Sequence, residues 1–191
     1  MSDSAAPERR IRKLLANEAP LLRDHLLRLD GDSRRTRFAH AVSDSYIEDY
    51  AGRMLDLGSI VYGCFIDGEM RGAAELRKLG ETWGREAEAA FSVEAAHQDD
   101  GLGTDLMGKV IRSARNRGVQ LLFMCCLGEN VRMQAIARKF DAELRFEYGE
   151  VVGEIVPQIP NYFSVLEEAV EDRVGFMMAV LNLQHRLLWA A

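Results

Sequence analysis

The clearest chemical pattern in the chain is a pair of closely spaced glycines, Gly101 and Gly103. Residues 87–96 before them alternate as a β-strand does, and residues 102–117 after them repeat apolar residues at helical spacing. Glycine has no Cβ, so a ligand can approach the backbone N–H groups at such a turn. The first N–H groups of a helix lack internal partners and lie at the positive end of its dipole. The stretch predicts a phosphate or pyrophosphate site, and a tight turn without ligand is the alternative.

Two other glycine motifs fit these residues less well. The dinucleotide-binding fingerprint needs a small residue where Leu106 stands. The phosphate-binding loop G-x-x-x-x-G-K-[ST] matches Gly103, Gly108 and Lys109, but Val110 replaces the hydroxyl residue that would bind magnesium. In addition, the residues between the two glycines of that motif have helical spacing. Neither motif is therefore favoured.

The order Gln98, Gly101, Gly103 resembles the acyl-CoA signature Q-x-x-G-x-G of the GNAT superfamily of N-acyltransferases. The family continues with a strand and a helix opened by Asn, here residues 119–127 and Asn130. This resemblance covers roughly residues 60–146. It implies acetyl-CoA or CoA as a co-substrate and no metal. The residues implied to bind it are Ser92 and Val93 through their backbone, Gln98, Gly101, Leu102, Gly103, Thr104 and Asn130.

The resemblance implies acyl transfer, in particular acetyl transfer, to a primary amine of a small molecule or a protein by direct attack in a ternary complex. The attacking amine must lose a proton, and bases in the family often lie on the strand before the glycines. Glu88 is the predicted base, because alternation places it on one face with Ala90 and Ser92. Glu75 is the second candidate. A solvated or cross-strand charge is the alternative for Glu88.

Two features depart from the family pattern. Ala137 stands where many members have a Tyr that protonates the leaving thiolate, so Tyr148 or solvent would take this role. Asp99 and Asp100 add negative charge beside the implied pyrophosphate site, where like charges ~4 Å apart repel by about 1 kcal/mol in water. An Asp that caps the helix and points away would reduce this repulsion. The departures motivate an alternative function: a lapsed GNAT-like domain that binds acyl-CoA or a protein partner in a regulatory or structural role.

Composition narrows the class of protein. The chain has 191 residues, of which 48% are hydrophobic and 28% charged, with a formal net charge of −6. These values fit one domain with an extension and argue against a general nucleic-acid binder. The three cysteines lie in apolar runs, which indicates reduced thiols. We find no signal-peptide-like N-terminus and no run of the ~20 apolar residues that a membrane span needs, so we expect a cytoplasmic protein without a membrane partner.

The order of predicted elements indicates an α/β (α+β) fold in residues 1–156. Helices are predicted at 18–29 and 43–57, and the basic segment 33–38 between them reads as a solvated loop, with contact to phosphates or acceptor as the alternative. Residues 11–15 fit either an edge strand or a helix. An antiparallel meander follows (59–66, 70–79, 87–96), and a hairpin (143–148, 151–156) closes the chain. We predict a mixed, mostly antiparallel central sheet with helices on both faces.

Residues 157–191 form a predicted C-terminal extension with a long helix at 162–189. Its polar face is acidic, which argues against a helix that lies on a membrane surface. Its apolar area exceeds what a lone helix exposes, so we predict a homodimer contact, with packing on its own domain as the alternative. The apolar residues are Leu166, Val170, Met177, Leu181 and Leu188, with Val174, Met178 and Val180 beside them.

Overall fold

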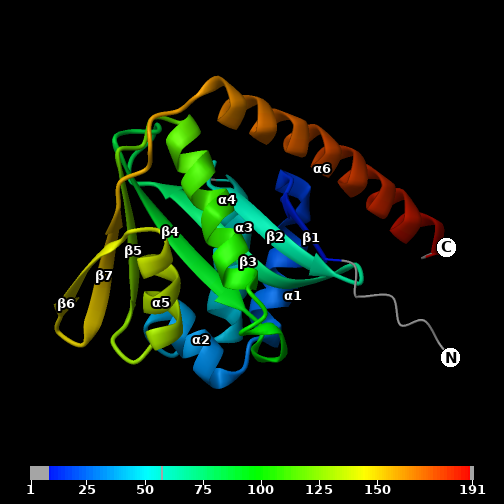
Figure 1. Cartoon of the computed structure of the whole chain (residues 1–191). Coiled ribbons are helices and arrows are strands. Elements are labelled where there is room, and N and C mark those ends of the chain that lie inside the picture. Colours follow the sequence, from blue (N-terminus) through cyan, green and yellow to red (C-terminus); the bar gives the residue numbers. More distant parts are fainter. Residues whose placement is uncertain (1–8, 57, 190–191) are drawn as a thin grey trace, which may run out of the picture.

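The computed structural model describes the backbone of residues 9–56 and 58–189 and the side chains of residues 9–55 and 58–181. These residues form one seven-stranded sheet in the order β1-β2-β3-β4-β5-β7-β6 (Figure 1). Neighbouring strands are antiparallel except β4 and β5, which are parallel. The strands are β1 Arg9–Lys13, β2 Ile60–Ile66, β3 Glu69–Lys78, β4 Glu86–Val93, β5 Leu121–Leu127, β6 Glu143–Glu147 and β7 Glu150–Ile155.

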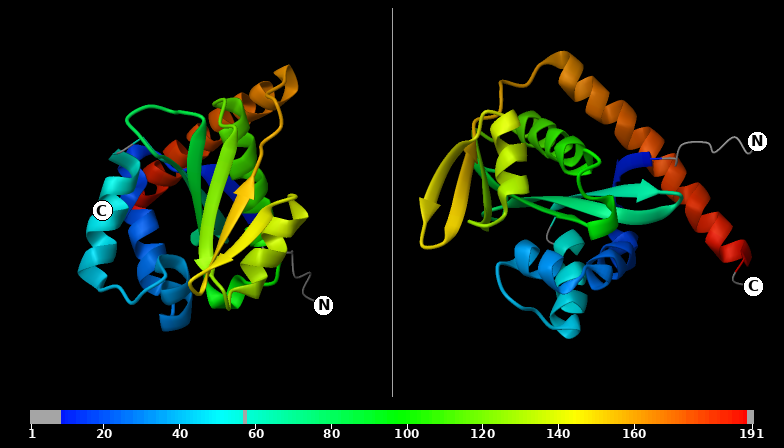
Figure 2. Two further views of the ribbon diagram at one scale, coloured as in Figure 1. Left: turned by 90° about the vertical axis from the view of Figure 1, so that its left-hand side faces the viewer. Right: turned by 60° about the horizontal axis from the view of Figure 1, so that its bottom comes forward.

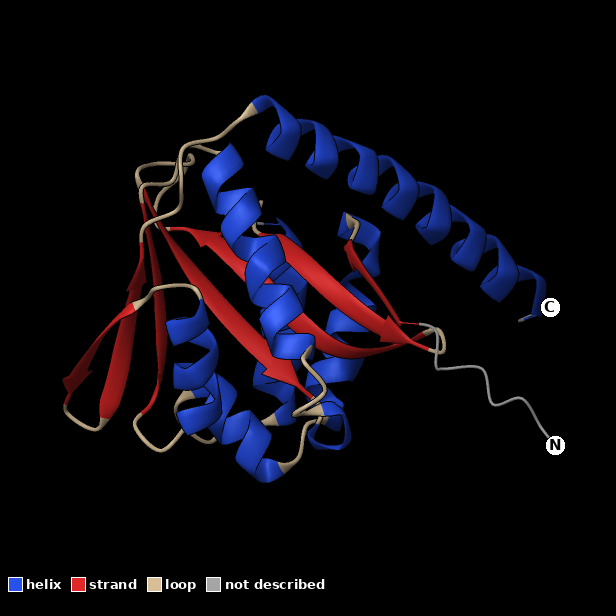
Figure 3. Ribbon diagram, in the orientation of Figure 1, coloured by secondary structure: helices blue, strands red, loops and turns tan. Residues whose placement is uncertain are grey.

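Helices cover both faces of the sheet, as predicted (Figures 2 and 3). One face carries α1 Ala19–Arg28, α2 Gly31–Phe38 and α3 Asp44–Asp56. The opposite face carries α4 Leu102–Asn116 and α5 Val131–Lys139, while α6 Tyr162–Trp189 lies across α4 and β1. Short 3₁₀ turns, η1 Ala16–Glu18 and η2 Ala95–His97, precede α1 and α4. No described helix has the length and apolar content needed to cross a membrane.

The sheet separates two hydrophobic cores. Leu106 and Val110 of α4 pack with Leu122 of β5 in one core, and all three are fully buried. Leu26 of α1 packs with Val61 of β2 in the other. Burying such a side chain stabilises the fold by about 1.5–3 kcal/mol, so the apolar face of α4 holds it firmly against the sheet. The glycine turn at its N-terminus is thereby held at a fixed place.

β4 and β5 diverge halfway along their length. In the described chain they pair only through residues 86–89 and 121–124. Beyond Ala89, β4 still pairs with β3 as far as Val93, while β5 pairs with β7. The edge of β4 at residues 90–93 therefore has no strand beside it on the β5 side, and its backbone groups there can bind an extended ligand.

One segment differs from its predicted element, and a second, whose element the sequence left open, is now assigned. Residues 33–38 are not a loop: they belong to α2, because the side chain of Asp30 accepts a hydrogen bond from the Ser33 N–H at 2.7 Å and caps this helix. Asp30 thus starts a second helix in the segment that we predicted to be a solvated loop. The ambiguous N-terminal segment forms β1, whose Ile11 pairs with Cys64 of β2.

Candidate active site

A cavity of about 750 Å³ lies at the point where β4 and β5 diverge. Its walls come from residues 91–93 of β4, the turn 97–104, α2, and the β5–α5 loop with α5. The divergent strands thus open onto the N-terminus of α4. Both predicted halves of a CoA site, the free strand edge and the glycine turn, line the same cavity.

The N-terminus of α4 is built to bind an anion. Gly101 precedes the helix with φ 79°, in the left-handed region that side chains disfavour. No side chain caps this helix, and its first internal hydrogen bond runs from the Asp105 N–H to the Gly101 carbonyl oxygen at 3.1 Å. The N–H groups of Leu102, Gly103 and Thr104 precede that bond and are therefore left for a ligand.

Gly103 allows a close contact between two helices. A Cβ at this position would lie 2.7 Å from Cδ1 of Ile136 on α5. The missing side chain therefore allows α5 to close against α4, with Ile136 in the cavity wall. The sequence analysis foresaw close approach of a ligand to the backbone, but the contact between the two helices has no local sequence signal.

The prediction that Asp99 or Asp100 caps α4 is wrong. Gly101 occupies the capping position, and α4 has no hydrogen bond to a capping side chain. Asp99 instead pairs with Arg132 of α5 at 3.0 Å. Both side chains are more than 60% exposed, so the pair contributes little to stability. The pair nevertheless places the positive charge of Arg132 at the turn, where it offsets the negative charge of Asp99 beside the predicted pyrophosphate site.

Gln98 and Asn130 contact the ends of the cavity. The Gln98 amide N–H donates to the Val93 carbonyl oxygen at 3.0 Å, which ties the turn to the free edge of β4. The Asn130 side-chain oxygen accepts from the Met133 N–H at 3.1 Å and so caps α5. That bond uses the oxygen of Asn130, and its amide N–H₂ is the end left for a ligand.

Glu88 and Glu75 have different surroundings, although both lie on the sheet face that carries α1–α3. The Glu88 side chain is 38% exposed and lies 3.5 Å from Arg77. Glu75 is fully buried and accepts hydrogen bonds from Arg37 at 2.6 Å and from Tyr50. Burial alone would raise the pKa of Glu75, but Arg37 and Arg77 outweigh it and lower this pKa. Glu75 is thus an ionised group that orders its neighbours, whereas Glu88 is accessible.

Tyr148 lies on the turn between β6 and β7, where its side chain is fully exposed and its φ is 49°. It is not among the residues that line the cavity. Its neighbour Gly149 accepts a hydrogen bond from the Gly128 N–H at 2.8 Å, so the turn lies beside the end of β5. The structure does not bring Tyr148 together with Glu88 or the glycine turn.

The sequence analysis missed a buried group on α1. His25 Nδ1 lies 3.2 Å from a Glu94 oxygen, and Nε2 lies 2.9 Å from the hydroxyl of Ser92, which lines the cavity. No short stretch of the sequence contains this set, because 67 residues separate His25 from Ser92. Only the packing of α1 on the sheet brings them together.

These features agree with a family match. The model of the acetyltransferase (GNAT) family matches residues 24–142, more than half of the chain. The chain belongs to the GNAT acetyltransferase family. The predicted resemblance is therefore confirmed, and Gln98, Gly101 and Gly103 of its signature all line the cavity. No curated protein matches the chain in sequence.

Solved structures confirm the GNAT-like fold. The GNAT domain of PAT from S. lividans has a TM-score of 0.64 and 22% identity, over 79% of this chain and 96% of that one. The putative acetyltransferase yncA from Salmonella typhimurium, solved with acetyl-CoA, has a TM-score of 0.59 and 15% identity, over 78% of this chain and 94% of that one. A ribosomal-protein-alanine N-acetyltransferase from Brucella melitensis has a TM-score of 0.60 and 17% identity, over 77% of this chain and 99% of that one. At these identities the likeness shows the fold alone.

The GNAT site fits CoA by its own geometry. The uncapped N-terminus of α4, the left-handed Gly101 and the free edge of β4 match a pyrophosphate followed by an extended arm. Lys139 and Arg132 also line the cavity and supply positive charge near its α5 wall. Among the described residues there is no group of three or more His, Cys, Asp or Glu side chains that could hold a metal ion.

Proposed function

We propose that the protein is an N-acyltransferase that moves an acetyl group from acetyl-CoA to a primary amine of a small molecule or a protein. One observation carries this proposal: the free edge of β4 leads, within one cavity, into the uncapped N-terminus of α4. Residues 98–104 would hold the pyrophosphate. The backbone of Ser92 and Val93, with Asn130, would hold the pantetheine arm.

Glu88 is the proposed general base. It is accessible, and it lies just before the point where β4 and β5 diverge. In the proposed reaction the amine nitrogen attacks the thioester carbonyl carbon while Glu88 takes its proton. A backbone N–H of the free β4 edge would stabilise the negative charge on the thioester oxygen. The C–S bond then breaks, and the leaving thiolate takes a proton from solvent, because Tyr148 does not line the cavity.

The sheet face around Glu88 favours a cationic acceptor. Glu88 lies opposite Phe123 of β5, Phe123 opposite Glu154 of β7, and Glu154 opposite Glu143 of β6. Facing residues on neighbouring strands share a face, so three carboxylates form a row across the sheet. Arg145 pairs with Glu154 at 3.2 Å and offsets part of this charge. A protein amine is supported by the name of the Brucella neighbour, and the structure favours neither acceptor class over the other.

A lapsed domain that binds acyl-CoA or a protein partner without turnover is the second candidate. Ala137 favours it, because this fully buried residue stands at the place of the Tyr that many relatives use as an acid. Release of thiol from acetyl-CoA across a panel of small amines and basic peptides separates the two functions. Turnover that disappears in Glu88→Gln supports the transferase. Tight binding of CoA with no turnover by any member of the panel supports the lapsed domain.

Calorimetric titration with acetyl-CoA tests the site itself. We expect micromolar affinity in the parent protein and none in Gly103→Glu, whose side chain would enter the α4–α5 contact and oppose the pyrophosphate. Gly80→Glu is the matched control, because nothing lies within 4 Å of a Cβ at Gly80. Absence of binding by the parent would overturn the transferase and the acyl-CoA-binding form of the second candidate, and would leave only a protein partner for this fold.

A further inference from the structure

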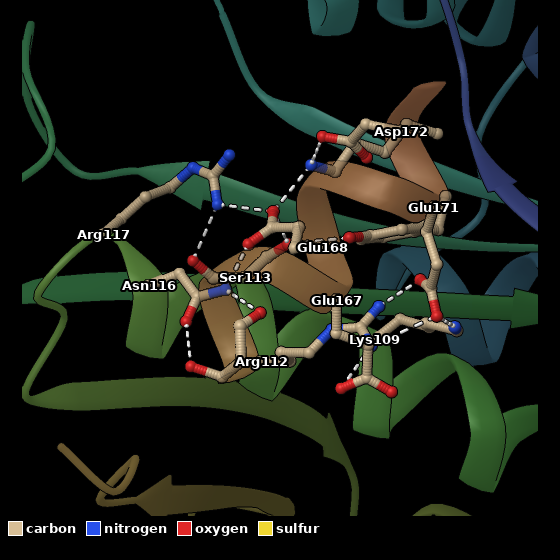
Figure 4. Close-up of polar contacts among 12 residues, drawn as sticks. Lys109, Arg112, Ser113, Asn116, Arg117, Glu167, Glu168, Glu171 and Asp172 are labelled. Atoms are coloured by element: carbon tan, nitrogen blue, oxygen red, sulfur yellow. Dashed lines mark hydrogen bonds and ion pairs between the residues drawn. The ribbon is translucent and has the colours of Figure 1, made fainter. Parts of the chain in front are cut away.

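The charged face of α6 is turned toward its own domain. Glu168 is 6% exposed and accepts a hydrogen bond from Ser113 of α4 at 2.7 Å (Figure 4). It also pairs with Lys13 of β1 at 2.6 Å and with Arg117 at 2.8 Å. The same face of α6 makes further ion pairs with the domain. Glu171 pairs with Lys109 and Arg112, and Asp172 pairs with Lys13. Contacts to the domain therefore use the acidic side of the helix.

The opposite side of α6 is apolar and exposed. Nine of the sixteen large hydrophobic residues that are exposed in the described chain lie on this one helix. Single exposed apolar residues are ordinary, but a contiguous patch indicates an interaction surface. We call its central row the apolar stripe: Phe163, Leu166, Val170, Val174, Met177 and Leu181, with exposed fractions between 46% and 77%.

The spacing of the stripe is regular. Successive members are 3, 4, 4, 3 and 4 residues apart, which is an 11-residue repeat. Such a repeat keeps its residues on one side of a nearly straight helix, as needed for pairing with another helix. The sequence continues the pattern to His185 and Leu188, whose side chains lie outside the described residues. When these two positions are included, the series of spacings is symmetric about a point between Val174 and Met177.

The exposed area of the stripe approaches that of a standard dimer interface. Its six residues expose on the order of 600 Å² when their exposed fractions are applied to side chains of about 150–200 Å². A standard interface buries about 800 Å² on each partner. A groove of about 390 Å³ adjoins the stripe, between Phe176 of α6 and Leu21 of α1, and gives the surface a concave, largely apolar margin.

We propose that α6 pairs with α6 of a second copy of this chain, antiparallel across a two-fold axis between Val174 and Met177. In this arrangement Val174 of one copy faces Met177 of the other, and Val170 faces Leu181. The symmetric spacing of the stripe selects a second copy, because a two-fold contact must be complementary to itself. A membrane surface fits less well, because the exposed carboxylate of Glu167 flanks the stripe. The proposal does not depend on the proposed transferase activity.

Light scattering of the whole chain at micromolar concentration tests the assembly. We expect twice the mass of one chain, and Val174→Glu should raise the dissociation constant about 100-fold or more, since each dimer would bury two unpaired charges. Leu79→Glu is the matched control, because Leu79 is 57% exposed directly after β3 and is not part of the stripe. A monomeric parent would overturn the proposal, as would a dimer that Val174→Glu leaves intact. Circular dichroism verifies that each variant folds.

Disulfide cross-linking tests the orientation. The background is Cys125→Ser, because Cys125 is exposed whereas Cys64 and Cys126 are buried. A mixture of Val170→Cys and Leu181→Cys chains should cross-link at least ten times more than either chain alone. Equal cross-linking of a single variant with itself would indicate parallel helices and overturn the antiparallel arrangement. Flotation of a monomeric chain with phosphatidylserine vesicles would show instead that the stripe binds lipid.

Discussion

Nε2 of His25 lies 2.9 Å from the hydroxyl oxygen of Ser92, so one hydrogen bond joins α1 to the free end of β4. Glu94 is a carboxylate that accepts only, so His25 Nδ1 carries the proton and Nε2 accepts from Ser92. Burial alone would raise the pKa of Glu94, but hydrogen bonds from His25 and Arg71 and the charge of Arg28 lower it to about 2. His25 therefore fixes the strand segment that would bind the pantetheine arm.

We expect His25→Ala to weaken acetyl-CoA binding more than it slows turnover. The change leaves the Ser92 hydroxyl without its buried partner, removes one of the hydrogen bonds to Glu94, and should destabilise the fold by about 2–3 kcal/mol. Steady-state kinetics should show a several-fold rise in KM for acetyl-CoA and a smaller change in kcat, with His25→Gln partly restoring KM. A fall in kcat at unchanged KM would contradict this positioning role.

His25 also predicts how stability depends on pH. Burial lowers the pKa of His25 below its ordinary value of 6.5, despite the opposing effect of Glu94. The unfolded chain therefore takes up the proton first as the pH falls through 6.5, and this favours unfolding. Urea denaturation between pH 8 and pH 5.5 should show stability that decreases toward acid. His25→Gln lacks this group, so a slope equal to that of the parent would contradict the assignment.

The contact between α6 and α4 should contribute strongly to stability. Glu168→Gln removes the buried anion that Lys13 and Arg117 share, leaves Lys13 with Asp172 alone, and should cost about 2 kcal/mol. Glu167→Gln should change stability by less than about 0.5 kcal/mol, because Glu167 is 63% exposed and pairs only with Arg112, at 3.3 Å. Chemical denaturation of both variants measures the difference. Similar losses in the two would mean that burial of Glu168 is unimportant.

Glu168 should also make the stability of the protein fall at acid pH. Burial alone would raise the pKa of Glu168, but hydrogen bonds from Lys13, Asn116, Ser113 and Arg117 lower it from 4.5 to about 2. The stabilisation is therefore complete above pH 4.5 and is lost as the pH falls from 4.5 toward 2. In Glu168→Gln this part of the acid-induced loss should be absent.

Gly103→Ala should weaken acetyl-CoA binding through α5. Its Cβ would meet the end of the Ile136 side chain, which must move and shift the cavity wall. Adding Ile136→Ala removes that atom and should restore part of the affinity, although each single change weakens binding. Calorimetry of the two single variants and the double variant gives the coupling. Simple additivity would show that Gly103 is needed for the ligand and not for the helix contact.

The two glutamates on the α1–α3 face should separate catalysis from stability. Glu88→Gln should lower kcat about 100-fold or more with little change in stability, as expected for an accessible base. Glu75→Gln should destabilise the protein by about 3–5 kcal/mol, because it leaves the buried Arg37 without its carboxylate. Thermal melting and acetyl-transfer rates measure both. Equal activity loss without destabilisation in Glu75→Gln would point to Glu75 as the base.

Local pattern was sufficient for most of the fold. The meander of β2, β3 and β4, the amphipathic α4 and the long α6 were all predicted, because each depends on residues close together in the chain. Residues 33–38 of α2 were predicted to be a solvated loop because of their three arginines. The residue that caps this helix, Asp30, lies outside that segment. Propensity alone undervalues such a cap.

The candidate site was predictable only in part. Gln98, Gly101 and Gly103 form a contiguous motif, and all three line the cavity. The wrong prediction that Asp99 or Asp100 caps α4 arose because the charge that compensates Asp99 comes from Arg132, on another helix. His25 and Ile136 act across long sequence distances, so no short window of the sequence contains their partners.

The ion pairs of Lys13 with Glu168 and Asp172 join the first strand to the last helix, across 155 and 159 residues. During synthesis β1 leaves the ribosome long before α6 exists. The sheet and its two cores can assemble while Lys13, Lys109 and Arg112 still face solvent, and the contacts of α6 form later. Until then the growing protein has a basic face, which α6 neutralises last.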